Sequence, residues 1–287
     1  MDLASSLRDA TQRLAQAGVP SPQVDAEMLL AHAAGVSRGE LLARVHSGKT
    51  VEDADLAQWD KLIVRRENRE PLQHLTGTAA FMSFEVKVGP GVFVPRPETQ
   101  SLVEHAIAQA QVMAVREVGL HIVDLCSGSG VVAISLARAV LHASVVAVEA
   151  SASAVEYLRH NVDTLAPNIT VVESDVVSFG QSVKDASIDM IVANPPYVPL
   201  AEVPNDPEVF RYDPVMALYG GEDGLDTVHE IVTLATRALR PGGYLAIEHS
   251  NLQGDAVRFT LKEAGLRMVS TELDLVGRER FTQGFQS

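Results

Sequence analysis

The first 70 residues carry apolar side chains at helical spacing. Leu56, Trp59, Leu62 and Ile63, for example, fall on one face of a helix. Candidate helix starts place serine or threonine before a proline or three residues before an acidic side chain: Ser21 with Pro22, Ser37 with Glu40, and Thr50 with Asp53. The pattern predicts a small helical bundle.

Between residues 75 and 97 the pattern changes to alternating apolar positions interrupted by glycine and proline. Phe84, Val86 and Val88 alternate with polar residues, and a Pro-Arg-Pro sequence ends the segment. This texture is typical of a β-hairpin that leads into a tight turn. We therefore expect the junction between two domains here.

Short apolar strands and amphipathic helices alternate beyond residue 98. Strands are expected at 121–125, 145–149, 169–173, 188–193 and 244–249, and helices at 131–140, 152–165, 227–239 and 254–264. Two further strands, 267–275 and 280–285, have no helix between them and predict an antiparallel closing hairpin. The alternation predicts an α/β fold, with a mostly parallel sheet covered by helices and ligands at the carboxyl ends of its strands.

The length of the chain also favours more than one domain. A chain of 287 residues exceeds what one small core usually contains, and about two domains are expected. We accordingly divide it into an N-terminal helical domain at 1–74, a hairpin linker at 75–97 and a catalytic domain at 98–287.

The charge of the chain bears on its partners. The formal net charge is −14, and residues 81–287 carry most of the acidic excess. Binding that depends on phosphate neutralisation needs Lys and Arg, so this charge disfavours a direct nucleic-acid partner and favours a protein partner.

Cysteine content and hydropathy indicate the compartment. The single Cys126 cannot form an internal disulfide, which agrees with a reducing environment and excludes a cysteine-based metal cage. No apolar run is long enough for a membrane span, and Asp2, Arg8 and Asp9 interrupt any signal-peptide core. We expect a cytoplasmic protein with no membrane partner.

A glycine-containing loop follows the first strand of the second domain. The strand ends at Asp124 and is followed by the loop residues Cys126, Ser127, Gly128, Ser129 and Gly130, directly before a predicted helix. Backbone amides at such a helix start can face a bound nucleotide. A plain tight turn is the alternative, because the dinucleotide pattern G-x-G-x-x-G is absent.

Acidic residues end the next two strands. Glu149 lies where a carboxylate can accept hydrogen bonds from both ribose hydroxyls, and Asp175 lies where an acceptor could receive an adenine amino group. Helix capping is the alternative for each residue. Their position at successive strand ends favours a nucleoside-binding site.

The strongest motif is Asn194-Pro195-Pro196-Tyr197, directly after the apolar strand 188–193. Two prolines stiffen the turn, so that the Asn194 side-chain oxygen and the Pro195 carbonyl can accept the two hydrogens of an NH₂ group while the Tyr197 ring packs against a planar substrate. A rigid loop with a turn asparagine and a core tyrosine is the alternative. The motif indicates methyl transfer to a planar amide or amine nitrogen, catalysed by orientation and electrostatics without a metal. Glu248 and His249 end a strand at the same edge, and we interpret them as structural.

These residues resemble the release factor glutamine N5-methyltransferase (PrmC/HemK) family over nearly the whole chain. The motifs that carry the resemblance are Gln73-His74-Leu75-Thr76-Gly77, Val94-Pro95-Arg96-Pro97-Glu98-Thr99, the glycine loop, Glu149, Asn194-Pro195-Pro196-Tyr197 and Arg211-Tyr212-Asp213-Pro214. The resemblance implies a Rossmann-like class I methyltransferase fold.

The resemblance also implies site residues. S-adenosyl-L-methionine would lie against Asp124, the loop from Cys126 to Gly130, Glu149, Asp175, Val176 and Asn194. The Asn194-Pro195-Pro196-Tyr197 turn, with Arg96, would hold the glutamine of the Gly-Gly-Gln tripeptide of class-I peptide chain release factors. Cys126 stands where the family usually has glycine, and Val176 stands where some members have tryptophan. The helical domain would recognise the release factor, and we expect a monomer.

Two other functions fit parts of the pattern. A nucleic-acid N6-adenine or N2-guanine methyltransferase could use the same Asn-Pro-Pro-Tyr acceptors, although the acidity of the chain argues against it. A non-catalytic module that binds release factor or ribosome could keep the fold, but the presence of Asp124, Glu149 and Asn194 in the sequence argues against it.

Overall fold

The computed structural model describes residues 3–47, 51–115 and 119–287, which form two compact units. The first unit comprises the chain up to Thr78 together with Asn205–Tyr212, and the second comprises Ala79–Pro204 and Asp213–Ser287. The segment Asn205–Tyr212 therefore packs with residues far from it in the sequence, which no local pattern indicates. Each unit is described by itself.

The first unit is helical. Its helices are α1 (Leu3–Gln16), α2 (Pro22–Ala33), α3 (Arg38–His46), α4 (Asp53–Glu67), α5 (Leu72–Thr76) and α10 (Pro207–Tyr212). The predicted cap at Ser37 is confirmed, because its Oγ accepts a hydrogen bond from the Glu40 amide at 3.1 Å. Ser21 precedes α2 without a side-chain cap bond, and the predicted start at Thr50 lies outside the described residues. The helical prediction for this region is confirmed.

A buried ion pair lies inside the first unit. The Arg66 Nε donates to the Asp25 Oδ2 at 2.7 Å, and both residues are almost fully buried. A second nitrogen of Arg66 lies 2.8 Å from a carboxylate oxygen of Glu208 at the start of α10. Burial raises the pKa of Asp25, while the bond from Arg66 opposes that shift. Arg66 therefore compensates two carboxylates that come from distant parts of the chain.

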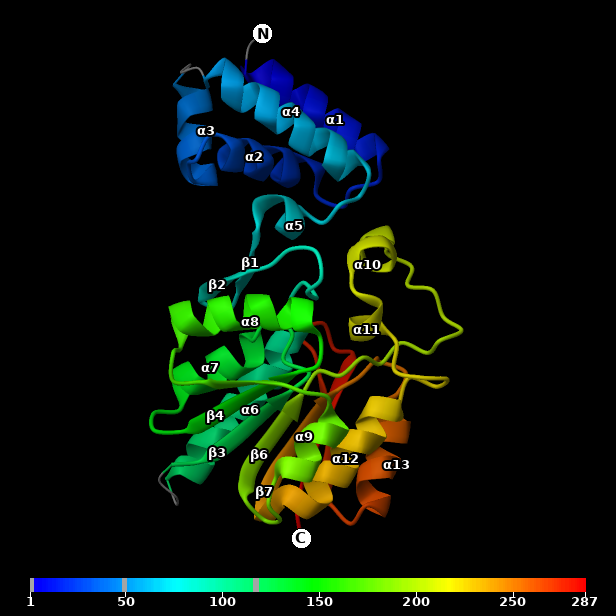
Figure 1. The fold of residues 1–287 in the computed structure, drawn as a ribbon. Helices are drawn as coiled ribbons and strands as arrows, with labels where there is room; N and C mark the ends of the chain where they lie inside the picture. Colours follow the sequence, from blue (N-terminus) through cyan, green and yellow to red (C-terminus); the bar gives the residue numbers. More distant parts are fainter. Residues whose placement is uncertain (1–2, 48–50, 116–118) are drawn as a thin grey trace. The chain divides into compact units, whose positions relative to one another are not determined.

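The second unit contains a seven-stranded sheet with the order β5-β4-β3-β6-β7-β9-β8 (Figure 1). The strands are β3 (His121–Leu125), β4 (Ser144–Glu149), β5 (Thr170–Glu173), β6 (Ile188–Ala193), β7 (Leu239–Glu248), β8 (Arg267–Leu273) and β9 (Glu279–Phe285). Pairing is parallel from β5 through β7, and β9 is antiparallel to both of its neighbours. The mostly parallel sheet and the antiparallel closing hairpin are thus confirmed.

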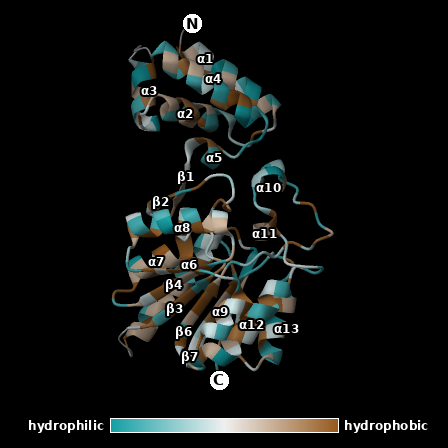
Figure 2. Ribbon diagram, in the orientation of Figure 1, coloured by the Kyte–Doolittle hydropathy of each residue, from teal (hydrophilic) through white to brown (hydrophobic). Residues whose placement is uncertain are grey.

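Helices cover both faces of the sheet. The elements are α6 (Thr99–Ala114), α7 (Val131–Ala139), α8 (Ala152–Leu165), α9 (Val176–Ser182), α11 (Val215–Leu218), α12 (Asp226–Ala238) and α13 (Gly254–Glu263). One buried cluster joins α6, α7 and α8 to the sheet, and another joins α9, α12 and α13 to it. Figure 2 shows hydrophobic colour along the central strands and hydrophilic colour on much of the outer helix surfaces.

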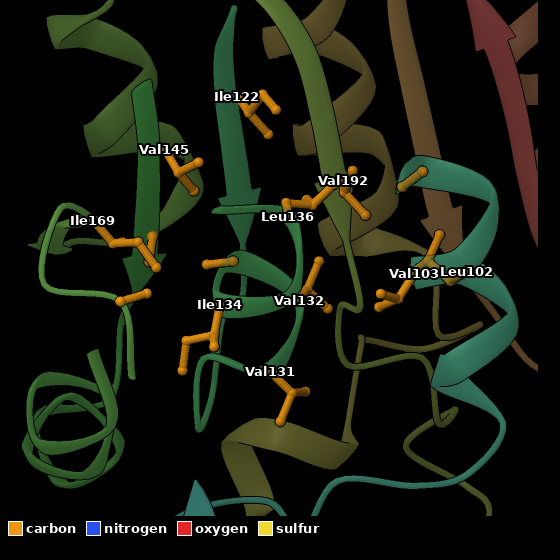
Figure 3. Close-up of a cluster of buried hydrophobic side chains, with 14 of the residues drawn as sticks. Leu102, Val103, Ile122, Val131, Val132, Ile134, Leu136, Val145, Ile169 and Val192 are labelled. Carbon is orange, nitrogen blue, oxygen red and sulfur yellow. The ribbon is translucent and has the colours of Figure 1, made fainter. Parts of the chain in front are cut away.

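Alternate side chains of the central strands contribute to the two buried clusters on opposite faces of the sheet. Ile122 and Val192 belong to the first cluster, whereas Val123 and Ile191, their neighbours in sequence, belong to the second. Successive side chains of a strand point to opposite faces, so a strand buried on both faces is apolar along most of its length. Figure 3 shows Ile122, Val145 and Val192 gathered with side chains of α6 and α7.

The region at 75–97 differs in part from the expectation. Only β1 (Thr78–Phe81) and β2 (Phe84–Lys87) form the hairpin, and residues 88–97 have no helix or strand although Val92 and Val94 are buried. The alternating pattern there reflects burial of an irregular segment. Four helices were not predicted from the pattern: α6, α9, α10 and α11. Among the described residues, no helix is both long enough and apolar enough to cross a membrane.

Loss of Arg66 should unfold the first unit more easily than loss of an exposed arginine. Arg66→Ala leaves Asp25 and Glu208 without their cation, and breaking a buried pair costs about 3–5 kcal/mol. Arg44→Ala, which removes the exposed pair with Glu40, should cost about 0.5 kcal/mol or less. Urea unfolding followed by fluorescence of Trp59, the single tryptophan, reports on this unit. Equal losses for the two variants would contradict a stabilising role for the buried pair.

Candidate active site

The candidate residues gather where parallel strands end. Leu125 of β3 pairs with Val148 of β4 and with Ala193 of β6, so the segments that follow these three strands leave the sheet at one edge. The glycine loop follows Leu125, and Asn194 follows Ala193. The structure therefore brings together the loop and the Asn-Pro-Pro-Tyr turn, which are far apart in the sequence.

The glycine loop is held in a compact conformation. The Ser127 amide donates to the Val148 carbonyl at 3.0 Å, and the Gly130 amide donates to the Ser127 carbonyl at 2.8 Å. Gly130 has φ +89°, and a Cβ there would lie 2.6 Å from the Leu158 side chain. At Gly128 the space that a Cβ would occupy is open. One glycine thus permits helix packing, and the other leaves backbone accessible to a ligand.

Cys126 is the residue of the loop that departs from glycine. Its φ of +60° lies in the left-handed region, which costs a non-glycine residue about 1 kcal/mol or more. The half-buried side chain packs against the apolar cluster that includes α9 and α12. Burial, together with the nearby Glu149 and Asp124 carboxylates, raises the pKa of the thiol well above its usual range. Cys126 is therefore a protonated packing residue rather than a reactive thiolate.

Asp124 is a buried carboxylate below the loop. Its Oδ2 accepts a hydrogen bond from the Ala133 amide at 3.1 Å, while its Oδ1 is buried with no hydrogen-bond partner among the described residues. Burial, with a smaller contribution from the Glu149 charge, raises the pKa of Asp124 to about 7, against hydrogen bonding from Ser127 and Ala133. A buried acceptor without a donor is costly unless something else satisfies it.

Glu149 ends β4 and organises the neighbouring backbone. Its two carboxylate oxygens accept hydrogen bonds from the Gly128 amide and the Ser151 amide, each at 2.8 Å. The side chain is half-buried. Glu149 therefore fixes the glycine loop in addition to offering lone pairs to a ligand.

Asp175 and Val176 begin α9. The Asp175 carboxylate accepts bonds from the Ser178 amide at 2.7 Å and the Ser178 hydroxyl at 2.9 Å. These bonds, above all the one from the backbone amide, lower the pKa of Asp175. The structure thus shows the helix-capping role, and a contact between Asp175 and adenine remains a prediction. Val176 is buried in the adjacent apolar cluster.

The Asn194-Pro195-Pro196-Tyr197 turn follows a fully buried strand. The Asn194 Nδ2 donates to the Thr99 Oγ1 at 3.3 Å, across from the start of α6. The Tyr197 carbonyl accepts a bond from the Gln253 Nε2 at 3.0 Å. Burial raises the pKa of the Tyr197 hydroxyl, so this group stays neutral.

Arg96 has a partner inside the second unit. Its Nη2 donates to the Asp213 Oδ2 at 2.6 Å, and its guanidinium lies 5.1 Å from the centre of the Phe93 ring. The Asp213 side chain is completely buried. Arg96 therefore joins the Pro-Arg-Pro segment to the Arg-Tyr-Asp-Pro segment, and its contact with substrate remains a prediction.

Asn161, which sequence reasoning missed, holds two segments of this region together. The Asn161 Nδ2 donates to the carbonyls of Ser129 and Lys87, and its Oδ1 accepts from the Lys87 amide. Asn161 lies on the buried side of α8, where a polar residue interrupts an otherwise apolar face; that interruption is the one signal of its role in the sequence.

Glu248 was interpreted from sequence as structural, and its surroundings place it at the site. The residue is almost fully buried, and burial raises its pKa to about 7, opposed first by a hydrogen bond with Thr99 and then by Arg280. The Asn194 side chain also lowers this pKa, to a smaller extent. His249, in contrast, is held by Thr282 and the Ser250 carbonyl, and burial lowers its pKa. Within the ranges that the structure describes, no group of three or more His, Cys, Asp or Glu side chains is placed to hold a metal ion.

Family comparisons agree with this arrangement. Residues 5–77 match the family described as the PrmC N-terminal domain, and residues 97–205 match the methyltransferase small domain. The solved 16S rRNA N2 G1207 methyltransferase of T. thermophilus, in complex with AdoMet and guanosine, is similar with a TM-score of 0.52 and 23% identity, over 73% of this chain and 50% of that one. A methyltransferase from Pyrococcus furiosus is similar with a TM-score of 0.51 and 19% identity, over 72% of this chain and 91% of that one. These structures establish the methyltransferase fold.

Sequence relatives are much closer. A release factor glutamine methyltransferase of Streptomyces coelicolor is 44% identical over 97% of this chain and 96% of its own length. Those of Mycolicibacterium smegmatis and Bifidobacterium longum are 43% and 37% identical, over 97% and 96% of this chain and 96% of their own lengths. Similarity of this extent covers the helical unit as well as the sheet. The chain therefore belongs to the release factor glutamine methyltransferase family.

Proposed function

We propose that this protein transfers a methyl group from S-adenosyl-L-methionine to the side-chain amide nitrogen of the glutamine in the Gly-Gly-Gln tripeptide of class-I peptide chain release factors. The observation that carries the proposal is the pairing of Leu125 with Ala193, which starts the glycine loop and the Asn194 turn at the same level on adjacent strands. Relatives at 37–44% identity are named for glutamine methylation of release factors.

The described residues fit the cofactor. The Oδ1 of Asp124 is an unused buried acceptor, and the open space at Gly128 permits close approach to the backbone. Glu149 has lone pairs beyond those used by its two backbone donors, and could accept bonds from ribose hydroxyls. Cys126, Ser127, Ser129 and Gly130 would complete the loop around the ligand. Val176 would supply an apolar surface for adenine beside Asp175.

The chemistry of the amide explains the acceptors. When bound, the cofactor supplies a methyl group on a sulfonium sulfur, which keeps the bonding electron pair as the methyl group leaves. The amide nitrogen is a poor nucleophile because its lone pair is delocalised into the carbonyl. Acceptance of its two hydrogens by the Asn194 Oδ1 and the Pro195 carbonyl would move electron density toward nitrogen and orient its lone pair. The methylated nitrogen then releases one proton to water.

The remaining turn residues limit the geometry of the substrate. Pro195 and Pro196 remove two backbone donors, so nothing in the turn competes for the acceptors. Tyr197, neutral and partly buried, offers an aromatic surface for the planar amide. We assign catalysis to orientation and preorganised hydrogen bonding, supplied by this chain without a covalent intermediate.

A methyl-transfer assay distinguishes this function from nucleic-acid methylation. Purified protein is given methyl-labelled cofactor and either a release factor, rRNA or DNA, and the modified product is mapped by mass spectrometry. Label on the Gly-Gly-Gln glutamine supports the proposal. Label on an adenine or guanine amine, with none on release factor, would replace it with the nucleic-acid alternative.

Replacement of Glu149 should weaken cofactor binding. Glu149→Ala removes the proposed ribose acceptor and also frees the Gly128 amide, so affinity should fall about ten-fold or more. Glu173→Ala is the matched control, because Glu173 pairs with Glu149 in register on the next strand. Titration calorimetry with S-adenosyl-L-methionine measures both variants. An affinity unchanged in Glu149→Ala would leave Glu149 a purely structural residue.

Replacement of Asn194 should affect chemistry more than binding. Asn194→Ala removes the proposed amide acceptor and leaves Glu149 and the glycine loop intact, so cofactor affinity should stay within a few-fold. Single-turnover methyl transfer should slow by about 10²-fold, the scale for loss of one preorganised electrostatic contact. Asn168→Ala, on the exposed turn after α8, is the control. A parental rate in Asn194→Ala would overturn the mechanism.

The helical domain is proposed to recognise the release factor, with residues 75–97 as linker to the catalytic domain. A fragment of residues 75–287 should bind cofactor and methylate a short Gly-Gly-Gln peptide at the full-length rate. On intact release factor it should be slower by about ten-fold or more, because remote contacts that orient the substrate are lost. Initial rates on the two substrates test this, with cofactor binding as the check on folding. An intact-factor rate equal to that of the full chain would rule out the recognition role.

A further inference from the structure

Thr99, Asn194 and Glu248 lie together behind the Asn-Pro-Pro-Tyr turn: Asn194 makes a hydrogen bond with Thr99, and Asn194 and Glu248 directly follow the paired residues Ala193 and Ile247. The three residues come from the start of α6, the end of β6 and the end of β7. Thr99 and Glu248 are almost fully buried, and Asn194 is partly buried in front of them. Sequence spacing does not predict that these three residues lie close together.

The direction of each hydrogen bond follows from the chemistry of the groups. Hydrogen bonding from Thr99 lowers the pKa of Glu248, and an ionised carboxylate only accepts, so we assign the single hydroxyl proton of Thr99 to the Glu248 carboxylate. The Thr99 oxygen can then only accept from Asn194, and the Asn194 Nδ2 lies 3.3 Å from it. The Asn194 side chain also lowers the pKa of Glu248, as a donor facing the carboxylate would, and the two residues follow the paired Ala193 and Ile247 on adjacent strands. The NH₂ group of Asn194 is thus bound on the protein side.

We propose that Glu248 and Thr99 are positioning residues that fix the Asn194 amide with its Oδ1 presented to the substrate. An asparagine amide can rotate by half a turn at little cost when nothing distinguishes its two ends. The reversed orientation would present a donor to the substrate NH₂ group and repel it. The inference rests on the proposed function, since it explains how the acceptor of that reaction keeps its orientation.

The burial of Glu248 shows that this orientation has an energetic cost. Its Oε2 has no hydrogen-bond partner among the described residues, and none of the salt bridges between them includes Glu248. Arg280, whose charge lowers the pKa of Glu248, forms its salt bridge with Asp274 instead. A buried carboxylate with one unsatisfied oxygen is unfavourable for stability alone. An apolar residue at the end of β7 would suit the neighbouring core better, so the carboxylate has a role that packing does not explain.

Three single variants test the positioning roles of Glu248 and Thr99. Glu248→Gln keeps the shape and can donate to Asn194, so the fixed orientation is lost; Thr99→Val removes the hydroxyl, and Thr99→Ser keeps it. We expect Glu248→Gln and Thr99→Val to lower kcat for release factor methylation by about ten-fold or more. Thr99→Ser should restore most of the rate. Cofactor affinity should stay within two-fold or so in all three, which a general loss of structure would not allow.

Two further variants reverse the polarity of the Asn194 and Glu248 pair. Asn194→Asp places a second carboxylate beside Glu248, so this variant should methylate slowly. In the combination of Asn194→Asp with Glu248→Gln, the amide of the new glutamine can donate to the new carboxylate. The combined variant should therefore be faster than Asn194→Asp alone, a coupling that separate structural damage would not produce. Slower methylation by the combined variant would overturn the proposal.

The pH profile gives an independent readout. Protonation of Glu248 supplies a donor toward Asn194, and its raised pKa places this change near pH 7, so kcat should fall as the pH drops from 8 to 6. Thr99, Asn194, Arg280, Glu98 and Tyr197 are the polar and charged groups that act on Glu248. Asp124 also titrates near this pH, so saturating cofactor and comparison with Glu248→Gln isolate the contribution of Glu248.

Failure of the proposed function and failure of the positioning role give different experimental results. If the parent protein methylates no release factor, the proposed function is wrong. If the parent methylates release factor and Glu248→Gln and Thr99→Val match its kcat and its pH profile, the positioning role is wrong while the function stands. Parent-like kcat/KM in both variants at pH 6 and pH 8 is the result that overturns the inference.

Discussion

Parallel pairing of β3 with β4 and β6 is the constraint on which the site depends. The three strands end at one edge, so the glycine loop, Glu149 and Asn194 emerge together although they are separated in sequence. Every residue of β6 is buried, and its side chains supply two different cores. A shift of one residue in register would exchange the two faces and displace Asn194 from the loop. Strand burial therefore fixes the position of the chemistry as well as the fold.

Side-chain hydrogen bonds to backbone hold the loops that the sheet brings together. Glu149 accepts hydrogen bonds from two backbone amides, and Gln253 donates to the Tyr197 carbonyl. Asn161 binds the backbone amide and carbonyl of Lys87 and one carbonyl of the glycine loop. Such bonds replace the regular ladder where the strands have ended. A site that must orient a poor nucleophile benefits from loops fixed before substrate arrives. Glu149, Asn161 and Gln253 thus support the loops, and ligand contact is a further role that we propose for Glu149.

The sequence pattern predicted those elements whose signal lies within a single segment of the chain. The apolar strands and the Ser37 cap were identified because one segment contains the whole signal. The start of α6 was missed because Glu98 precedes it without a side-chain cap bond, and α10 was missed because its place is set by Arg66, far away in sequence. At the site, residue types at strand ends were predictable, whereas the partners of Asn194 and Arg96 were not. These partners depend on the order of the strands in the sheet and on loops that meet only after folding. No periodic pattern in a single sequence indicates which residues of such loops will be neighbours.

Two buried carboxylates show that the site is not arranged for stability. Burial raises the pKa of both Asp124 and Glu248 to about 7, so the folded protein binds more protons than the unfolded chain between the ordinary carboxyl range and neutrality. The free energy of unfolding contributed by these groups therefore falls as pH rises through that window and is greatest below it. Ordinary paired carboxylates act in the opposite direction. A cationic ligand beside Asp124 would offset part of this cost by favouring its ionised form, whereas Glu248 lies with Thr99 and Asn194 behind the turn. The stability given up at Glu248 is consistent with a residue kept for the orientation of its neighbour.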